Sequence, residues 1–444
     1  MNLKWSLVFI IIISIVLRSF FLHPTFSDEN FYFNVGKNIL QGKIPYKDFF
    51  FSHPPLQVYT LVLFFKLFGT SFMVGKALTL ITSSVCVFFL FLISKELYDK
   101  KTAFVTALIF LLTPVFLVFS TMGYGMWETM FLVLFSTYLL TKNRQKLGGI
   151  TFSIAILFRY LAIIYLPFLI ILLYLRKKKF RTFLSSFFLT SFISGLLIFS
   201  TFGSSYIDQT ISYHLFSKVI MGSKDIQTMQ YWSIGYFFLF LSLISTFVGY
   251  VEKDKTLLLF SVTALVADIM ILIGLRLIFY HYFFISLALC LIATGRALII
   301  SKDKIVKIMI PIILLLSITL NLESIDFYLD LIHAERYYSM AEFIQNNTSE
   351  EDKIFGEPVA TNFVSFVTGR RISSDYLDSY LRHLMFEGEE KVIQNLEEET
   401  PKFIIEMENY YMTNHYFRDY MMNNYNFKIK LTGTPNYSVY MRAS

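Results

Sequence analysis

A series of long apolar blocks constrains this sequence more than any other feature, because each block runs for about 15 to 25 residues with few charges. A helix rises 1.5 Å per residue, so a block of this length crosses the roughly 30 Å hydrocarbon core of a bilayer. Lipid offers exposed backbone groups no hydrogen-bond partner, so such blocks can span only as helices. The sequence therefore predicts an all-α polytopic membrane bundle.

Eleven blocks are predicted to cross the membrane. They are residues 5–22, 72–97, 102–120, 125–141, 146–159, 160–175, 182–202, 232–250, 256–275, 280–299 and 305–321. The blocks 146–159 and 160–175 are short, and a single bent element is an alternative interpretation of this pair. The first block carries no small-residue cleavage site before the acidic loop that follows it, so we expect a retained helix rather than a removed signal peptide.

The carboxylates divide the chain in two. Residues 1–322 contain 28 Lys and Arg against 12 Asp and Glu, whereas residues 323–444 contain 11 against 20. This change predicts a transmembrane bundle, with an outer loop at 23–71, followed by one soluble domain. The tail also alternates apolar, strand-like stretches such as 353–356 and 401–405 with helical ones, which predicts an α/β domain. The excess of Lys and Arg flanks the apolar blocks, so it does not indicate a nucleic-acid partner.

Short basic junctions indicate the orientation of the bundle. They lie at 95–101, 142–146, 176–181, 253–255 and 302–307. Basic loops stay in the cytoplasm, so these junctions are predicted to be inside. With eleven crossings the N-terminus is then cytoplasmic, and residues 323–444 lie outside the cell membrane as an extracytoplasmic domain.

The outer loop 23–71 contains two predicted helices. The first runs over 27–42, with Ser27 as its N-cap, acids in its first turn and Gly42 after its end. Its apolar stripe of Phe31, Val35 and Ile39 predicts a helix lying along the membrane interface. The second begins at His53-Pro54-Pro55 and runs to Phe68-Gly69, and we expect an interfacial or re-entrant helix.

Carboxylates are scarce in the bundle, which makes elimination informative. Those at cytoplasmic ends are explained as solvated flanking charge: Glu96, Asp99, Glu252, Asp254 and Asp303. Asp268 lies inside a span, where it is either functional or paired with a neighbouring helix. Asp208 and Asp225 lie in the polar loop 203–231 and carry no local signature. The remaining candidates are Asp28, Glu29, Asp48 and Glu128. A carboxylate at the start of an outer helix can accept a proton from an acceptor group. Ordinary helix-start chemistry is the alternative for Asp28 and Glu29.

Basic and aromatic residues at outer helix ends supply candidate phosphate contacts. The segment His53-Pro54-Pro55-Leu56 offers a helix N-terminus beside an imidazole, and its alternative is a surface turn. Two other groups are Arg159-Tyr160, and Arg276 with Tyr280-His281-Tyr282. Arginine suits a phosphate diester in a poorly solvated site, whereas interface anchoring is the alternative for both groups.

Several other chemistries lack a signature here. Cys86 and Cys290 are both in apolar blocks, so neither a disulfide framework nor a catalytic thiol is expected. The sequence carries no metal-ligand spacing such as HExxH and no glycine-rich nucleotide loop. It therefore indicates no cofactor and leaves any requirement for a divalent metal open.

Taken in order, these residues resemble the GT-C superfamily of integral-membrane glycosyltransferases, and in particular its protein O-mannosyltransferase and lipid A aminoarabinose transferase branch (glycosyltransferase family 39-like). The resemblance covers residues 1–322. Its motifs are Asp28-Glu29, the G-x-x-P-Y-x-D-F stretch from Gly42 to Phe49, the His53-Pro54-Pro55-Leu56 helix ending Leu67-Phe68-Gly69, Arg159-Tyr160, and Arg276 followed by His281-Tyr282.

The resemblance implies a polyprenyl-phosphate sugar donor such as dolichyl phosphate mannose and an outward-facing site. It further implies that Asp28 is the catalytic acid and Glu29 its companion, and that Glu128 matches a second acidic position. His53 stands where the aminoarabinose enzymes have Lys. Phe31 stands where they have Arg, which implies a different sugar or acceptor.

We therefore expect an inverting glycosyltransferase of the cell membrane, acting on a glycan, lipid or protein acceptor. Asp28 is expected to be the general base, and Arg276 and His281, with His53, to hold the donor phosphate. A transporter or flippase of lipid-linked glycans is the alternative, which predicts mid-membrane ionisable residues and internal repeats. Only Asp268 fits the first of these, and no repeat is seen. A non-catalytic assembly factor would leave the order of motifs in the outer loop unexplained.

Overall fold

The fold is described from a computed structural model, which covers residues 3–217, 227–274, 279–320, 335–408, 410–432 and 436–443. The chain divides into two compact units. One unit comprises residues 1–22, 76–197 and 222–328, and we call it the bundle unit. The other comprises residues 23–75, 198–221 and 329–444, and we call it the outer-loop unit.

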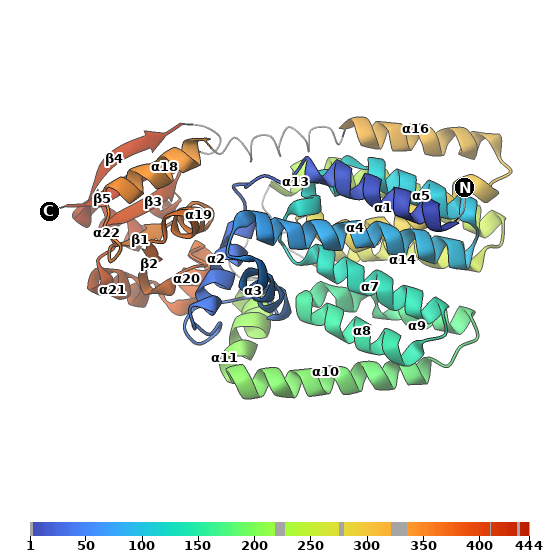
Figure 1. Ribbon diagram of the computed structural model, residues 1–444, viewed down its shortest axis with the longest axis horizontal. Helices are drawn as coiled ribbons and strands as arrows, with labels where there is room; N and C mark the ends of the chain where they lie inside the picture. The colour runs from blue at the N-terminus through green and yellow to red at the C-terminus, as the bar shows by residue number, and fades with distance from the viewer. Residues whose placement is uncertain are drawn as a thin grey trace. The chain divides into compact units, whose positions relative to one another are not determined.

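Every predicted membrane block coincides with a helix or a pair of helices, running beside one another in the bundle unit (Figure 1). The long helices are α1 (Leu3–Ser19), α4 (Phe72–Leu97), α5 (Lys100–Leu112), α7 (Met126–Thr141), α8 (Gln145–Phe158), α9 (Leu166–Leu175), α10 (Phe180–Phe202), α13 (Gln227–Val251), α14 (Lys255–Gly274), α15 (Phe284–Ile300) and α16 (Lys304–Leu320). Shorter elements are α6 (Pro114–Val118) and the 3₁₀ turns η1 (Phe119–Thr121), η2 (Tyr160–Tyr165) and η4 (Tyr280–Phe283).

Within the described residues, four helices are long and apolar enough to cross a membrane by themselves, or five if one bent pair counts as a single span. The four are Phe72–Leu97, Phe180–Phe202, Lys255–Gly274 and Tyr280–Ile300. The protein is thus a multi-pass membrane protein, and the total of eleven crossings stays a prediction.

The predicted span 102–120 is not one straight helix, which corrects the sequence interpretation. Its two parts, Lys100–Leu112 and Pro114–Thr121, meet at an angle of 70°. Pro114 has no backbone N–H, and its ring forces the preceding residue out of the helical region. Thr113 accordingly adopts φ −76° and ψ 112°. The proline in the block was the signal for this bend.

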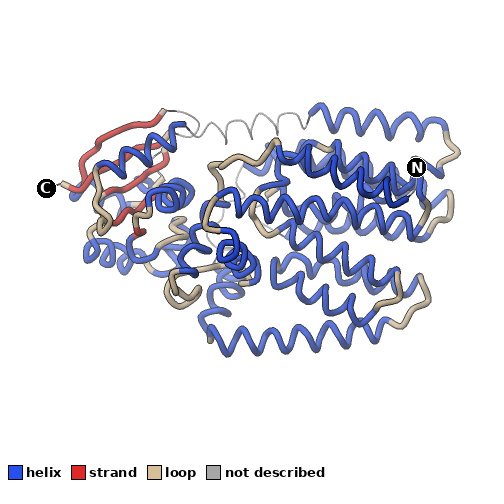
Figure 2. The backbone as a smooth tube through the Cα atoms, in the orientation of Figure 1, coloured by secondary structure: helices blue, strands red, loops and turns tan. Residues whose placement is uncertain are grey.

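The outer-loop unit contains a five-stranded sheet, drawn in red in Figure 2. The strands β1 (Lys353–Gly356), β2 (Arg371–Ile372), β3 (Phe403–Met407), β4 (Tyr425–Leu431) and β5 (Tyr437–Arg442) have the order β2-β1-β3-β5-β4. β1 pairs in parallel with β2 and β3, and β5 is antiparallel to β3 and β4. β1 and β3 are apolar and buried, as expected for inner parallel strands.

Helices connect the strands of this sheet, which confirms the predicted small α/β region. They are α18 (Glu335–Asn346), α19 (Pro358–Thr368), α20 (Leu381–Glu387), α21 (Glu389–Glu399) and α22 (His415–Asn424), with 3₁₀ turns η5 (Ser373–Asp375) and η6 (Tyr411–Thr413). The outer loop contributes α2 (Glu29–Leu40) and α3 (Leu56–Phe68), and residues 198–221 add α11 (Ser204–Ile207) and the π-helix η3 (Asp208–Ser217).

Helix α2 differs from its prediction in two ways. It begins at Glu29, with Asp28 rather than Ser27 at the N-cap, and the Ser27 hydroxyl lies 3.3 Å from the Thr25 hydroxyl. It is also buried on nearly every face instead of along the predicted stripe alone, because α3 and α19 both pack against it. The second partner comes from the far end of the chain, which local periodicity cannot reveal.

Candidate active site

Asp28 stands at the start of α2, and its carboxylate is held by a residue from the C-terminal region. The Tyr380 hydroxyl donates a hydrogen bond to Asp28 Oδ1 at 2.7 Å. The Asp28 side chain makes no capping hydrogen bond to the backbone of α2. It is partly exposed, and the helix N-terminus favours negative charge there. This geometry leaves the carboxylate able to accept a proton from a neighbouring group.

Glu29 is in a different environment although it is the next residue. Its side chain is fully buried, and the Thr25 hydroxyl donates a hydrogen bond to Glu29 Oε1. A buried carboxylate needs such partners to offset lost hydration. The structure therefore separates the predicted pair into one partly accessible acid and one enclosed acid.

A third carboxyl group, Glu357, lies in the same unit and was missed by sequence reasoning. It caps α19 by accepting a hydrogen bond from the Ala360 N–H at 2.8 Å. Burial, with a smaller contribution from the negative charge of Asp28, raises the pKa of the Glu357 carboxyl to about 7. Glu357-Pro358 before an apolar stretch was a helix-start signal, but nothing local connected it with Asp28.

His53 lies just before the N-terminus of α3 and is accompanied by a second histidine. The two ring centroids of His53 and His214 are 5.9 Å apart, and His53 also lies 5.6 Å from the ring of Tyr32 on α2. Nε2 of His214, on η3, lies 2.7 Å from the Ser52 carbonyl oxygen and donates to it. Two imidazoles beside a helix N-terminus form a candidate anion-binding site. His214 had no spacing signature in the sequence.

An Asp–His pair of the C-terminal region adjoins both groups. Nδ1 of His383 lies 2.5 Å from Asp378 Oδ1, and both side chains are buried. The His383 ring is 4.8 Å from the Tyr213 ring and 5.9 Å from the Tyr380 ring. Tyr380, the partner of Asp28, is therefore connected through the His383 ring to Tyr213, which precedes His214 in the sequence.

The remaining described candidates lie in the bundle unit, where Arg159 and Glu128 are both buried. Arg159 is extended, with φ −149° and ψ 126°, so α8 and η2 are separate elements. Its Nε donates to the Tyr124 carbonyl oxygen at 2.7 Å, and its charge acts on Glu128. Glu128, in the first turn of α7, accepts from the Thr82 hydroxyl at 3.4 Å.

His281 lies near the residue that binds Arg159, since the His281 ring is 4.9 Å from the ring of Tyr124. Tyr282 is adjacent, with its ring 4.7 Å from the His281 ring, and Tyr160 opens η2 directly after Arg159. Arg276 lies outside the described residues. Tyr124 was not predicted, although the Gly123-Tyr124-Gly125 turn beside Arg159 in the structure marks a special backbone position.

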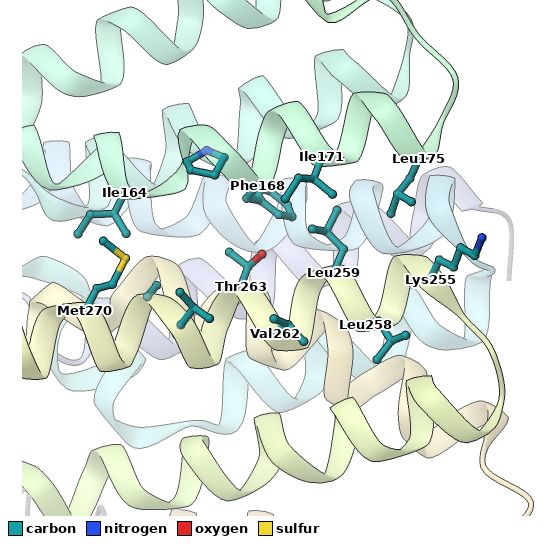
Figure 3. A pocket seen from close by; sticks show the side chains of 13 residues that line it. Ile164, Phe168, Ile171, Leu175, Lys255, Leu258, Leu259, Val262, Thr263 and Met270 are labelled. Carbon is teal, nitrogen blue, oxygen red and sulfur yellow. The ribbon is translucent and has the colours of Figure 1, made fainter.

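Two further features of the bundle unit are structural in character. The Ser286 hydroxyl donates a hydrogen bond to Asp268, so this intramembrane acid is paired with the neighbouring helix α15. An apolar cavity of about 400 Å³ lies between α9 and α14, where Ile171 lies opposite Leu259 (Figure 3). Among the described residues that line it, only Lys255 at one end is ionisable, so these walls offer no acid–base pair.

Comparison with known proteins identifies the architecture. Residues 52–204 match the family described as dolichyl-phosphate-mannose-protein mannosyltransferase. The whole chain shares its fold with 99% of ArnT from Cupriavidus metallidurans, crystallised with undecaprenyl phosphate, at a TM-score of 0.64 and 12% identity. The chain therefore has the fold of ArnT, and part of its sequence is similar to a family of mannosyltransferases. Both findings agree with the resemblance inferred from its motifs.

Two further proteins are similar to this chain in fold or in sequence. The oligosaccharyltransferase of Archaeoglobus fulgidus has the same fold over 98% of this chain and 73% of its own, at a TM-score of 0.56 and 15% identity. GPI mannosyltransferase 1 of Saccharomyces cerevisiae is 28% identical over 234 residues, which is 48% of this chain. The match spans only 57% of the yeast protein's length.

The described part of this chain brings together no group of three or more His, Cys, Asp and Glu side chains that could hold a metal ion. The donor set for a metal is therefore not assembled among these residues, and no catalytic step is assigned to one. The candidate chemistry rests on Asp28 and the imidazoles of the outer-loop unit.

Proposed function

We propose that this protein transfers a sugar from a polyprenyl-phosphate carrier to an acceptor on the outer face of the membrane. The observation that carries the proposal is the partly exposed Asp28 carboxylate, which a tyrosine orients and which does not cap its helix. Relatives named for mannosyl transfer, and a structural neighbour crystallised with undecaprenyl phosphate, support this donor class. The basic loops support the outward orientation.

In the proposed reaction, the acceptor heteroatom attacks the anomeric carbon from the face opposite the phosphate, so the configuration inverts. Asp28 takes the proton that the acceptor loses. The bond between the anomeric carbon and the phosphate oxygen breaks, and polyprenyl phosphate leaves with the electron pair. His53, His214 and the N–H groups that open α3 stabilise its growing negative charge.

The bundle unit is proposed to supply further substrate-binding residues. Glu128, Arg159, Tyr160, Arg276, His281 and Tyr282 are proposed substrate-binding residues within an eleven-helix membrane region, residues 1–322. Residues 323–444 are the proposed extracytoplasmic domain, and the acceptor is a glycan, a lipid or a protein. The membrane in question is the plasma membrane.

The decisive experiment incubates membranes containing the protein with a panel of polyprenyl-phosphate sugars, labelled in the sugar. We expect one donor to release polyprenyl phosphate while its label passes into a new product. Membranes containing the Asp28→Asn variant at equal abundance should release far less. Intact donor that only moves to the other leaflet would instead identify a flippase and contradict the proposal.

A further inference from the structure

The outer-loop unit contains a basic cavity of about 340 Å³ between α2 and the end of α19, and none of the candidate catalytic or substrate-binding residues is among the described residues that line it. Ligand pockets typically have volumes of roughly 300–1,000 Å³, so this one has the size of a small-molecule site. Its four basic residues are Lys37, Lys43, Arg370 and Arg371, and no carboxylate is among its lining residues. We call it the basic cavity.

The sequence builds this cavity from two local features. On α2, Asn34, Lys37, Asn38 and Gln41 recur at a helical spacing of three and four, which places them on one face. Opposite them, α19 ends at Thr368, and the φ of +77° at the following Gly369 turns the chain, so that Arg370 and Arg371 come directly after it. Few residues other than glycine adopt that conformation readily.

Three of the four cations contact only neutral groups or solvent among the described residues. The Lys37 ammonium lies 3.3 Å from the Ser365 carbonyl oxygen and 3.2 Å from that of Phe366. Arg370 is buried and donates to the Thr348 hydroxyl at 2.7 Å and to its carbonyl oxygen at 2.9 Å. The Arg371 side chain is exposed. Within the described ranges, only Lys43 forms an ion pair, with Asp375.

Such an arrangement is costly without a counter-charge. Like charges around one cavity repel each other, and partial burial strengthens the repulsion by lowering the local dielectric. Burial also lowers the pKa of the Lys37 ammonium. An anion in the cavity would reverse both effects, because Lys37 carries a third N–H beyond its two carbonyl partners and Arg371 offers a planar fork of donors.

We propose that the basic cavity binds a phosphate-class anion, namely the phosphomonoester or pyrophosphate group of a small sugar phosphate or of a lipid headgroup. Three cations without carboxylate partners match the charge of such a group, and arginine matches its geometry. The site does not include Asp28 and does not depend on the transferase proposal, because its occupancy is measured by binding alone.

The site is tested by isothermal titration calorimetry, in which inorganic pyrophosphate is added to the full-length protein in detergent. We expect saturable binding that weakens as NaCl is raised. The variant Lys37→Gln/Arg371→Gln should bind at least about tenfold more weakly, because charge-assisted hydrogen bonds are lost. Lys428→Gln, an exposed residue of β4, removes one charge elsewhere and should bind like the wild type. The single Arg371→Gln change affects an exposed side chain, so it keeps the test valid if the double variant unfolds.

Experiments in two kinds of vesicle distinguish whether the anion comes from a lipid headgroup or from a soluble sugar phosphate. Protein reconstituted in phosphatidylcholine with phosphatidic acid should lose pyrophosphate binding if a lipid headgroup occupies the cavity, whereas binding should persist if the ligand is soluble. Either result supports the site. An absence of saturable binding in detergent and in phosphatidylcholine vesicles would overturn the proposal, as would equal affinity in wild type and Arg371→Gln. Asp28→Asn should leave the affinity unchanged, so failure of the transferase proposal is recognised separately.

Discussion

The acids Asp28 and Glu128 illustrate how differently the two units treat the same kind of residue. Each lies at the start of a helix, where the dipole favours a carboxylate. Asp28 is partly exposed and receives the hydroxyl of Tyr380, which lies 352 residues away along the chain. Glu128 is buried and is acted on by the charge of Arg159. Arg159 in turn donates to the carbonyl oxygen of Tyr124, which lies only 35 residues before Arg159 in the chain.

This difference indicates separate roles. A general base must reach the proton that it accepts, which requires access as well as negative charge. A buried acid near a buried arginine mainly balances charge and maintains the local packing, because removing either one leaves an uncompensated group. The outer-loop unit is therefore the expected place of proton transfer, and the bundle unit the expected place of substrate positioning.

The largest effect is expected for Asp28→Asn, which directly tests whether Asp28, and not Glu128, accepts the proton. Asp28→Asn keeps the shape of the side chain but removes its basicity, so we expect turnover to fall by on the order of 10²–10⁴. Transfer kinetics of purified protein with the identified donor measure this, and donor affinity should persist. Asp48→Asn, an exposed acid of the same loop, is the matched control and should keep near-normal turnover.

Glu29→Gln sharpens the same point, since a buried neighbour should lose less turnover than Asp28→Asn. If Asp28→Asn retained near-normal transfer, the base would have to be sought elsewhere, beginning with Glu128. Equal losses in Asp28→Asn and Asp48→Asn would point to loop charge rather than to catalysis.

The second prediction concerns the stability of the bundle unit. Arg159→Gln removes a charged donor from the Tyr124 carbonyl and leaves Glu128 without its nearby charge, so we expect a destabilisation of roughly 3 kcal/mol. The midpoint of thermal unfolding in detergent measures it. Lys179→Gln, exposed in a basic junction, should leave the midpoint unchanged. An unaltered midpoint in Arg159→Gln would mean that Arg159 is retained for substrate alone.

The third prediction is a pH dependence in the outer-loop unit. Because the pKa of Glu357 is raised to about 7 in the folded protein, the folded state keeps this proton when the unfolded state has lost it. Its contribution to stability is thus fully present below the ordinary pKa of glutamate, and it is lost as the pH rises through 7. The unfolding free energy should fall by on the order of 2 kcal/mol between pH 5.5 and 7.5.

Thermal unfolding at a series of pH values, compared with Glu357→Gln, measures this contribution. The variant carries no titrating group at 357, so its stability should decline less over that range. Parallel declines in both proteins would show that Glu357 does not hold a proton near neutrality.

The smallest expected effect tests how Asp28 is oriented. Tyr380→Phe keeps the ring and removes only the hydroxyl that binds the carboxylate, and a hydrogen bond to a charged group contributes about 1.5–3 kcal/mol. We expect kcat to fall about tenfold with little change in the KM for the donor. A structural role alone would lower stability and leave kcat per folded molecule unchanged.

Much of the fold follows from local pattern. The apolar blocks coincide with helices, and the loop helix predicted at 27–42 occupies Glu29–Leu40, because length, capping residues and periodicity act over one or two turns. The bend at Pro114 was missed by the predicted span 102–120, although proline lacks the N–H that a continuous helix needs. Burial of α2 on its second face was not, because the partner α19 lies more than 300 residues away.

For the candidate site, the sequence by itself determined which groups can carry chemistry: a few carboxylates, arginines and histidines left in a chain with little charge. The helix-start position alone does not rank Asp28 above Glu29, because both share one helix start and one dipole, and only the family resemblance favoured Asp28. Only the tertiary structure gave the two acids different environments, by enclosing Glu29 with Thr25 and by bringing Tyr380 and Glu357 to Asp28. Accessibility and pairing depend on segments distant in the chain, and local sequence carries no record of which segments meet.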